Sequence, residues 1–152
     1  MKDYDYSKNN AYYITICTYK RQQLFGEIAG AVLCDRPNNP AAMVNKWLFE
    51  IENKYSGVNI LKYAIMPDHM HFILSLTGDH TGSPLPCIID WFKTMTTNEY
   101  IRGVKSNLFP PFDRHIWQSN YYEHIIRNEQ EYQEIWEYID TNTLKWDEDA
   151  RL

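Results

Sequence analysis

The stretch of sequence that decides the fold is residues 58–76, VNILKYAIMPDHMHFILSL. Its two parts, 58–66 and 69–76, are rich in β-branched and aromatic residues, and Pro67 and Asp68 separate them. Strands favour such residues, whereas a proline followed by an aspartate suits a tight connection. The stretch therefore predicts two strands that pair as antiparallel neighbours in a hairpin.

The residues before this hairpin predict more strand and a helix. Residues 12–19, YYITICTY, alternate β-branched and aromatic side chains, which is typical of a strand, and 28–34 predict a shorter strand that joins it in a hairpin. Asn39 suits a helix cap and Pro40 the first turn. Apolar residues then recur at helical spacing, so we expect a helix over 40–55.

The residues after the hairpin begin with a predicted loop at 78–84. Apolar side chains from Ile88 to Tyr100 recur at helical spacing, which predicts a second helix that ends near Gly103.

Beyond the Phe109-Pro110-Pro111 break, residues 114–118 predict a strand. Residues 129–142 carry apolar side chains at positions i, i+3, i+4 and i+7, which predicts a third helix. The order strand, helix, strand, strand, helix, strand is that of an α+β, ferredoxin-like split βαβ antiparallel sheet, here with an added C-terminal helix.

Length and composition set bounds on the class of protein. The 152 residues suit a single domain over 1–152, and 44% hydrophobic against 23% charged residues indicates a globular chain rather than a disordered one. The N-terminus lacks an apolar leader and no run is long enough to cross a bilayer, so we expect no membrane association. Three scattered cysteines predict neither disulfides nor a thiolate metal site, which favours the cytoplasm.

The net charge of −5 argues against indiscriminate binding to duplex DNA, because such binding comes from phosphate neutralisation by basic residues. Contact with nucleic acid would then be local. A basic strip can be drawn through five positions, although acidic residues interrupt it and a solvated surface of mixed charge is the simpler interpretation. The five positions are Lys93, Arg102, Lys105, Arg114 and Arg127.

His69 and His71 carry the first sign of chemistry. Strand side chains alternate between faces, so the two imidazoles share one face while Met70 and Phe72 point to the other. This spacing can chelate one divalent ion, but a lone His-x-His pair is more often structural. Further donors would be needed, and local spacing names none of them.

Tyr138 and Asn142 lie on one side of the predicted third helix, beside its apolar stripe. The simple interpretation is a boundary tyrosine with its hydroxyl in water. With a metal ion nearby, the tyrosine could act as a nucleophile. Mg²⁺ or Mn²⁺ on the histidines would polarise a phosphate, and Tyr138 would then attack phosphorus to form a 5′-phosphotyrosine.

Several quoted motifs extend this picture. The sequence around the histidines, Pro67-Asp68-His69-Met70-His71-Phe72, resembles the histidine-hydrophobic-histidine signature of HUH single-tyrosine transposases. Asp5-Tyr6-Ser7, Tyr13 to Thr18, Leu24-Phe25-Gly26, Phe92-Lys93 and the stretch from Ile116 to Asn128 are similar to the REP-associated tyrosine transposases, of the transposase IS200-like superfamily. The resemblance covers nearly the whole chain.

The resemblance implies an endonuclease and strand transferase that acts on single-stranded DNA, often near hairpins, with a divalent ion on His69 and His71. It implies that Tyr138 is the nucleophile, since the family's tyrosine precedes an Asn-Pro-Leu-Lys-Trp-like ending. Here the ending is Asn142-Thr143-Leu144-Lys145-Trp146, with Thr143 where the family usually has proline. By the same analogy Asn142 completes the metal shell. Relatives of this group differ in being monomers or dimers, so a homodimer stays open.

Three residues are candidates for DNA binding: Lys93, Trp117 and Arg127, of which Trp117 and Arg127 are equally well explained as structural. Ser119 stands where the family commonly has arginine, which removes a phosphate contact. The alternative to an enzyme is a catalytically silent, domesticated domain that binds structured DNA or RNA. The intact histidine pair and Tyr138 count against that alternative.

Overall fold

The computed structural model describes residues 10–25, 39–77 and 85–150, with side chains described as far as residue 141. Its elements are β1 (Asn10–Cys17), the 3-10 turn η1 (Tyr19–Arg21), α1 (Pro40–Lys54), β2 (Val58–Met66), β3 (His69–Leu76), α2 (Leu85–Lys105), β4 (Tyr122–Ile126) and α3 (Glu129–Ala150). None of the helices in the described part of the chain is long and apolar enough to span a membrane.

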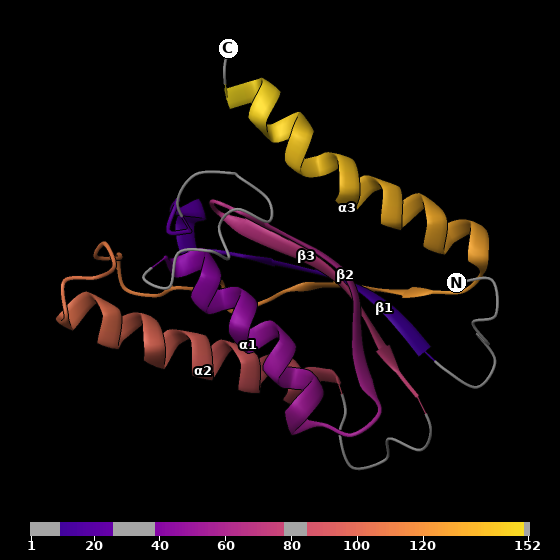
Figure 1. The fold of residues 1–152 in the computed structure, drawn as a ribbon, viewed down its shortest axis with the longest axis horizontal. Coiled ribbons are helices and arrows are strands. Elements are labelled where there is room, and N and C mark those ends of the chain that lie inside the picture. The colour runs from indigo at the N-terminus through magenta and orange to yellow at the C-terminus, as the bar shows by residue number, and fades with distance from the viewer. Residues whose placement is uncertain (1–9, 26–38, 78–84, 151–152) are drawn as a thin grey trace.

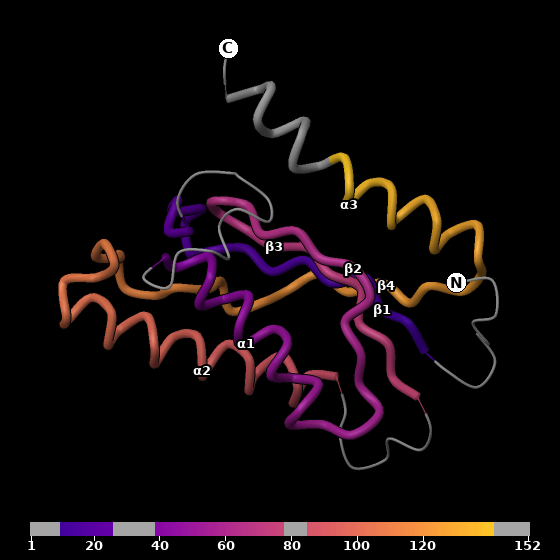
Figure 2. The backbone as a smooth tube through the Cα atoms, viewed as in Figure 1, coloured from indigo at the N-terminus to yellow at the C-terminus, as the bar shows by residue number. Residues whose placement is uncertain are grey.

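The strands form one four-stranded antiparallel sheet in the order β2-β3-β1-β4. Helices α1 and α2 cover one face of this sheet, and α3 runs across the other (Figure 1). Strands β1 and β4 lie side by side although they are far apart in the sequence, as the tube in Figure 2 shows. The predicted α+β fold with an antiparallel sheet and an added C-terminal helix is confirmed.

Strand β3 has both faces covered, because it is central in the sheet and helices lie on either side. Met70, Phe72 and Leu74 are 0% exposed and belong to the core beneath α1 and α2. Ile73 belongs to a smaller core with Ile139 of α3. The alternation of a strand thus divides β3 between two layers, and the histidines fall on the α3 side.

Helix α3 is fixed to the sheet at its start. The side chain of Asn128 accepts a hydrogen bond from the backbone N–H of Glu131 at 2.8 Å, which caps the helix. Glu131 in turn accepts hydrogen bonds from the Arg127 backbone N–H at 3.2 Å and from His124 Nε2 of β4 at 2.7 Å.

A second attachment lies further along α3. A β-bulge between Ile60 and Lys62 turns Lys62 towards the α3 face of the sheet. Its ammonium lies 2.8 Å from Asp140 Oδ1 and 3.9 Å from the centre of the Trp136 ring. The helix is therefore attached to β4 at one end and to β2 further along.

One predicted element is wrong. Residues 114–118 form no strand; their sheet contact is an isolated bridge between Thr18 and Trp117, and the strand that pairs with β1 is Tyr122–Ile126. The left-handed backbone of Arg114, with φ of 65°, breaks the extended conformation. The carbonyls of Gln118 and Ser119 accept hydrogen bonds from the Lys93 ammonium, at 2.9 and 3.3 Å, and not from a neighbouring strand.

Other boundaries move by smaller amounts. The first strand runs from Asn10 to Cys17 rather than over 12–19, because η1 begins at Tyr19. Helix α3 continues past Asn142 to Ala150, since no proline or glycine follows to end it. The strand predicted at 28–34 and the loop predicted at 78–84 lie outside the described residues.

Candidate active site

The side chains of His69 and His71 lie next to each other on β3, with ring centres 4.8 Å apart and planes at 72°. Both histidines are almost fully buried, at 7% and 6% exposure. Two desolvated imidazoles in the middle of a sheet are costly unless their nitrogens find partners. The neighbouring strand and the hairpin turn supply these partners.

Strand β1 supplies the partners of His71. The register pairs Thr15 with His71 and Tyr13 with Ile73, so the side chains of Thr15 and Tyr13 share the face of the imidazole. Thr15 Oγ1 lies 2.8 Å and Tyr13 Oη 3.0 Å from His71 Nδ1. The Tyr13 ring also stacks on the imidazole, at 5.7 Å and 25°. His71 is thereby fixed in orientation through its Nδ1 edge.

The turn before β3 supplies the partners of His69. Its Nδ1 lies 2.6 Å from Asp68 Oδ1, and the other oxygen of Asp68 accepts a hydrogen bond from Arg21 Nε at 3.0 Å. Arg21 and the preceding Lys20 both have left-handed backbones, with φ of 56° and 55°. Such strained residues concentrate at functional sites, and here the strain brings a half-exposed guanidinium beside the histidines.

Burial and neighbouring charges set the protonation of this cluster. Burial lowers the pKa of His71 to about 3, assisted by the charges of His69 and Arg21. Burial also lowers the pKa of His69, although Asp68 opposes the shift. For Asp68, burial opposes ionisation, but the hydrogen bonds from His69 and Arg21 outweigh it and lower the pKa. The pair is therefore neutral at pH 7, the state in which imidazole binds a metal ion.

Tyr138 lies above this pair on α3. Its ring centre is 5.7 Å from that of His71 and 6.4 Å from that of Tyr13. The next residue, Ile139, is fully buried in the small core, while Tyr138 itself is 54% exposed. The helix thus holds the phenol at the edge of the histidine pair, where it is open to a large substrate.

A second exposed tyrosine completes the surroundings. Tyr122 of β4 is 55% exposed, and its ring lies 5.9 Å from Tyr13, edge to face. Tyr13 itself has a raised pKa, mainly because it is buried. Of these tyrosines, Tyr13 is the one committed to hydrogen bonding within the protein, whereas Tyr122 and Tyr138 face outward.

The donors present fit a divalent ion in part. Asp68 can accept the Nδ1 proton of His69, and in that tautomer the lone pair of the imidazole lies on Nε2. Thr15 or Tyr13 can accept the corresponding proton of His71. No group of three or more histidine, cysteine, aspartate or glutamate side chains with metal-binding geometry occurs in the described ranges. Further ligands would come from amides, hydroxyls, water or the substrate. The side chain of Asn142 lies outside the described residues.

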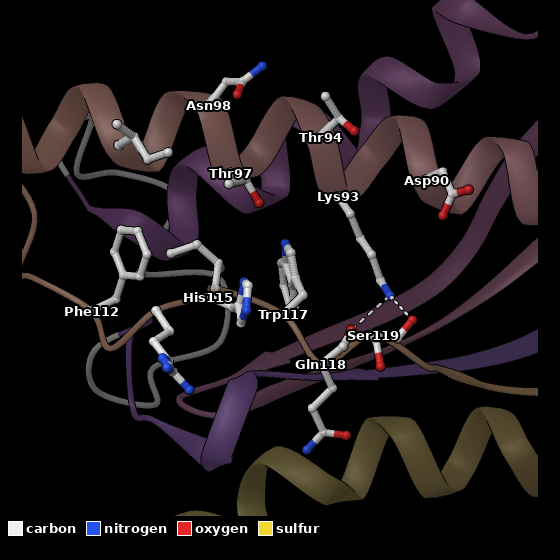
Figure 3. Close-up of a pocket in the computed structure, with 13 residues that line it drawn as sticks. Asp90, Lys93, Thr94, Thr97, Asn98, Phe112, His115, Trp117, Gln118 and Ser119 are labelled. Carbon is white, nitrogen blue, oxygen red and sulfur yellow. Dashed lines mark hydrogen bonds between the residues drawn. The ribbon is translucent and has the colours of Figure 1, made fainter.

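The residues predicted to bind DNA do not gather around the histidines. Lys93 of α2 lies on the opposite side of the sheet, where its ammonium contacts backbone carbonyls (Figure 3). Trp117 is 6% exposed, and its indole N–H donates to Thr96 Oγ1 at 2.9 Å, so it packs in the core beneath α2. Arg127 is exposed between β4 and α3.

Two cavities lie on either side of the segment that leads into β4. One of about 390 Å³, the α2 cavity, is lined by Asp90, Lys93, Thr94, Thr97, Asn98, Ile101, Phe112, Arg114, His115, Ile116, Trp117, Gln118 and Ser119 (Figure 3). Another of about 500 Å³, the η1 cavity, is lined by Tyr19, Lys20, His115, Trp117, Gln118, Ser119 and Asn120. The two share His115 and Trp117–Ser119.

Sequence reasoning missed Tyr13, Thr15, Asp68 and Arg21 as partners of the histidine pair. The alternation of 12–19 placed Tyr13 and Thr15 on one face of a strand, but the register against β3 decides that this face meets the histidines. Asp68 was taken as a turn residue, and its direct precedence to His69 was the available signal. Arg21 gave no signal in the sequence.

The sequence and the fold of this chain match those of known proteins. The family described as "Transposase IS200 like" matches residues 6–142, and the chain belongs to this family. A Haemophilus influenzae protein of uncharacterised function is 30% identical over 98% of this chain and 88% of its own length.

Two solved structures share the fold. One is a REP-associated tyrosine transposase bound to a REP hairpin, with a TM-score of 0.63 and 23% identity over 95% of this chain and 74% of that one. The other is a Deinococcus radiodurans protein with a provisional transposase designation, with a TM-score of 0.58 and 19% identity over 91% and 93% of the two chains.

Proposed function

We propose that this chain, acting as a single HUH domain over 1–152, nicks and rejoins single-stranded DNA with Tyr138 as the nucleophile. The observation that carries the proposal is the position of Tyr138. Its exposed phenol ring has its centre 5.7 Å from the centre of the buried, neutral imidazole of His71. The IS200-like transposase family supports DNA strand transfer as the reaction.

The chemistry follows from the side chains around the pair. Tyr138 Oη attacks the scissile phosphorus, the bond from phosphorus to the 3′-oxygen breaks, and the DNA is held as a 5′-phosphotyrosine. The phenol gives up its proton and the departing 3′-oxygen takes one up. Attack on the phosphotyrosine by another 3′-hydroxyl reverses the step and joins the new strand.

His69 and His71 would hold Mg²⁺ or Mn²⁺, with Asn142 as a further ligand, and the ion would neutralise charge on the scissile phosphate. Asp68, Thr15 and Tyr13 keep the imidazoles oriented through their Nδ1 edges. The chain thereby supplies two positioned, neutral donors.

Arg21 binds the DNA backbone in this proposal. Its Nε is used by Asp68, and its side chain is 51% exposed beside His69. A guanidinium has several N–H donors in a fixed fork, so one held by a carboxylate on one edge can still contact a phosphate with the other.

The substrate class we infer is single-stranded DNA that carries a hairpin, which the hairpin bound to the solved REP-associated relative supports. The net charge of −5 favours such a local, shaped target over general duplex binding.

The test uses labelled single-stranded hairpin oligonucleotides drawn from the DNA beside the gene, with Mn²⁺ or EDTA, and a denaturing gel. We expect a covalent adduct in Mn²⁺ that EDTA prevents and that Tyr138→Phe abolishes. Tyr122→Phe is the matched control, since this tyrosine is equally exposed and also contacts Tyr13, and it should retain the adduct. An adduct that survives Tyr138→Phe would place the nucleophile elsewhere, and tight binding without any adduct would favour a silent DNA-binding domain.

A further inference from the structure

The η1 cavity is connected to the candidate active site by backbone hydrogen bonds. The N–H of Gln118 donates to the carbonyl of Cys17 at 2.9 Å, and Cys17 is the register partner of His69. The N–H of Tyr19 donates to the carbonyl of Ile116 at 2.9 Å. The wall formed by Gln118 is thus one strand away from His69. The wall of the cavity is therefore joined to β1, the strand that pairs with the histidine strand β3.

Aromatic and amide groups line this cavity. The rings of Tyr19 and His115 meet edge to face at 5.0 Å, and His115 is exposed. Gln118, Ser119 and Asn120 add amide and hydroxyl groups, which both donate and accept hydrogen bonds. Ring faces together with amides are what proteins use to bind unstacked bases.

The charges at the cavity do not favour a free anion. The Lys20 ammonium lies 5.5 Å from the centre of the Tyr19 ring and 3.6 Å from Asp113 Oδ2, so a carboxylate stands beside this cation. A base, which carries no net charge, suits these surroundings better than a phosphate does. The volume of about 500 Å³ falls within the usual range of small-molecule sites and has room for one nucleotide.

The walls of the cavity are held in place from both sides. The amide nitrogen of Gln22, just after η1, donates to the carbonyls of Tyr19, Asp113 and His115 at 2.9, 3.2 and 3.1 Å. Its oxygen accepts from the Asp113 N–H at 2.6 Å. On the other side the Lys93 ammonium holds the carbonyls of Gln118 and Ser119 (Figure 3). A fixed wall binds a ligand with little ordering cost.

We propose that the η1 cavity binds one unpaired base of the DNA strand, adjacent to the phosphate that Tyr138 attacks. The inference rests on the proposed function and assigns a base-binding subsite to it. The α2 cavity is the weaker candidate, because the Lys93 ammonium is hydrogen-bonded to backbone carbonyls there and the sheet separates α2 from α3, the helix that carries Tyr138.

The test is a binding measurement in EDTA, which does not depend on cleavage. Fluorescein-labelled hairpin oligonucleotides with unpaired flanks are compared with versions that lack one flank base at a time, by fluorescence anisotropy. For the unchanged protein we expect affinity to fall about tenfold when one particular base is missing, as the loss of a stacked base does. His115→Ala and Asn120→Ala should each weaken binding of the intact oligonucleotide, and removal of that base should then cost little more.

Asn98→Ala is the matched control. Asn98 is exposed, and its replacement removes the same amide group as Asn120→Ala does. Of the two cavities, it lines the α2 cavity alone. It should bind all the oligonucleotides as the unchanged protein does. Melting temperatures of the three variants check that the fold is kept.

The proposal is overturned if the cavity variants bind the intact oligonucleotide normally, if their sensitivity to the missing base persists, or if Asn98→Ala gives the same loss. The adduct assay separates this result from the proposed function. If the protein forms the adduct normally and the cavity variants bind DNA as the unchanged protein does, the base-binding subsite is excluded and the proposed nuclease activity stands. A base-dependent loss of affinity without any adduct would support the subsite and remove the nuclease.

Discussion

The two faces of β3 differ in what they bury. On the face towards α1 and α2, Met70, Phe72 and Leu74 are fully buried among other apolar side chains. On the face towards α3, His69 and His71 are almost as deeply buried, but polar groups of β1 and of the turn before β3 surround their nitrogens. Burying an imidazole gains less than burying a hydrocarbon, and the lowered pKa values reflect that cost. One strand therefore stabilises the fold with one face and forms the candidate site with the other.

The largest effect that distinguishes the two faces of β3 should come from His71→Ala, which should affect activity far more than stability. We expect the rate of adduct formation to fall roughly a thousandfold, because stabilisation of the phosphate by the metal, worth several kcal/mol, is lost. The free energy of unfolding should change much less than it does on truncating the apolar face. Adduct kinetics in Mn²⁺ and urea denaturation measure the two effects. Normal adduct formation by this variant would exclude His71 as a ligand.

Phe72→Ala is the counterpart on the other face, one residue away. Phe72 is 0% exposed and packs near Phe92, so its truncation should lower the free energy of unfolding by about 3–5 kcal/mol. The folded fraction should still form adduct at the normal rate per molecule. If folded Phe72→Ala were inactive, the two faces would not be separable as described.

A smaller effect should follow from removing the hydroxyls beside His71. Tyr13→Phe combined with Thr15→Val leaves the imidazole but removes both contacts to Nδ1. We expect metal affinity, measured from the Mn²⁺ dependence of adduct formation, to weaken by about 10- to 100-fold, as loss of such partners typically does. Tyr12→Phe is the matched control, because Tyr12 points to the other face of β1. An equal loss in the control would argue against a role for Nδ1.

The smallest effect concerns the apolar layer at high pH. Burial raises the pKa of Tyr100 to about 12, and its hydroxyl donates to the carbonyl of Pro110 at 2.8 Å. Between pH 10 and the raised value the folded state keeps a proton that the unfolded state loses. Stability should therefore fall as the pH rises through this window.

Tyr100→Phe should cost about 1 kcal/mol at pH 7 through the lost hydrogen bond and should show a shallower alkaline loss. Urea denaturation at pH 7 and above pH 10 measures the difference. Parallel alkaline losses in the two proteins would contradict the assignment to Tyr100.

Much of the fold followed from periodicity in the sequence. The shared face of His69 and His71 needs nothing beyond the alternation of a strand, and both the hairpin and the first helix come from local patterns. Strand β4 was missed because Tyr122–Ile126 is largely exposed and shows little alternation of burial. The stretch 114–118 looked more like a strand, yet Lys93 and a left-handed residue hold it in another conformation.

The candidate site was less predictable, because it depends on contacts across the sheet. The position of Tyr138 beside the helix stripe was visible in the sequence, but its nearness to His71 depends on how α3 crosses the sheet. The contribution of Arg21 needs two successive left-handed residues, which Lys20 and Arg21 do not signal as glycines would.

The two attachments of α3 have a mechanical consequence. The helix is joined to β4 through His124 and Glu131 and to β2 through Lys62 and Asp140, and Tyr138 lies between these points. A DNA end bonded to Tyr138 would be attached to a helix that is fixed to the sheet on both sides of that residue. Tension from the departing strand would pass into opposite edges of the sheet rather than tilt the helix, so the bonded end would stay over the histidines until its replacement arrived.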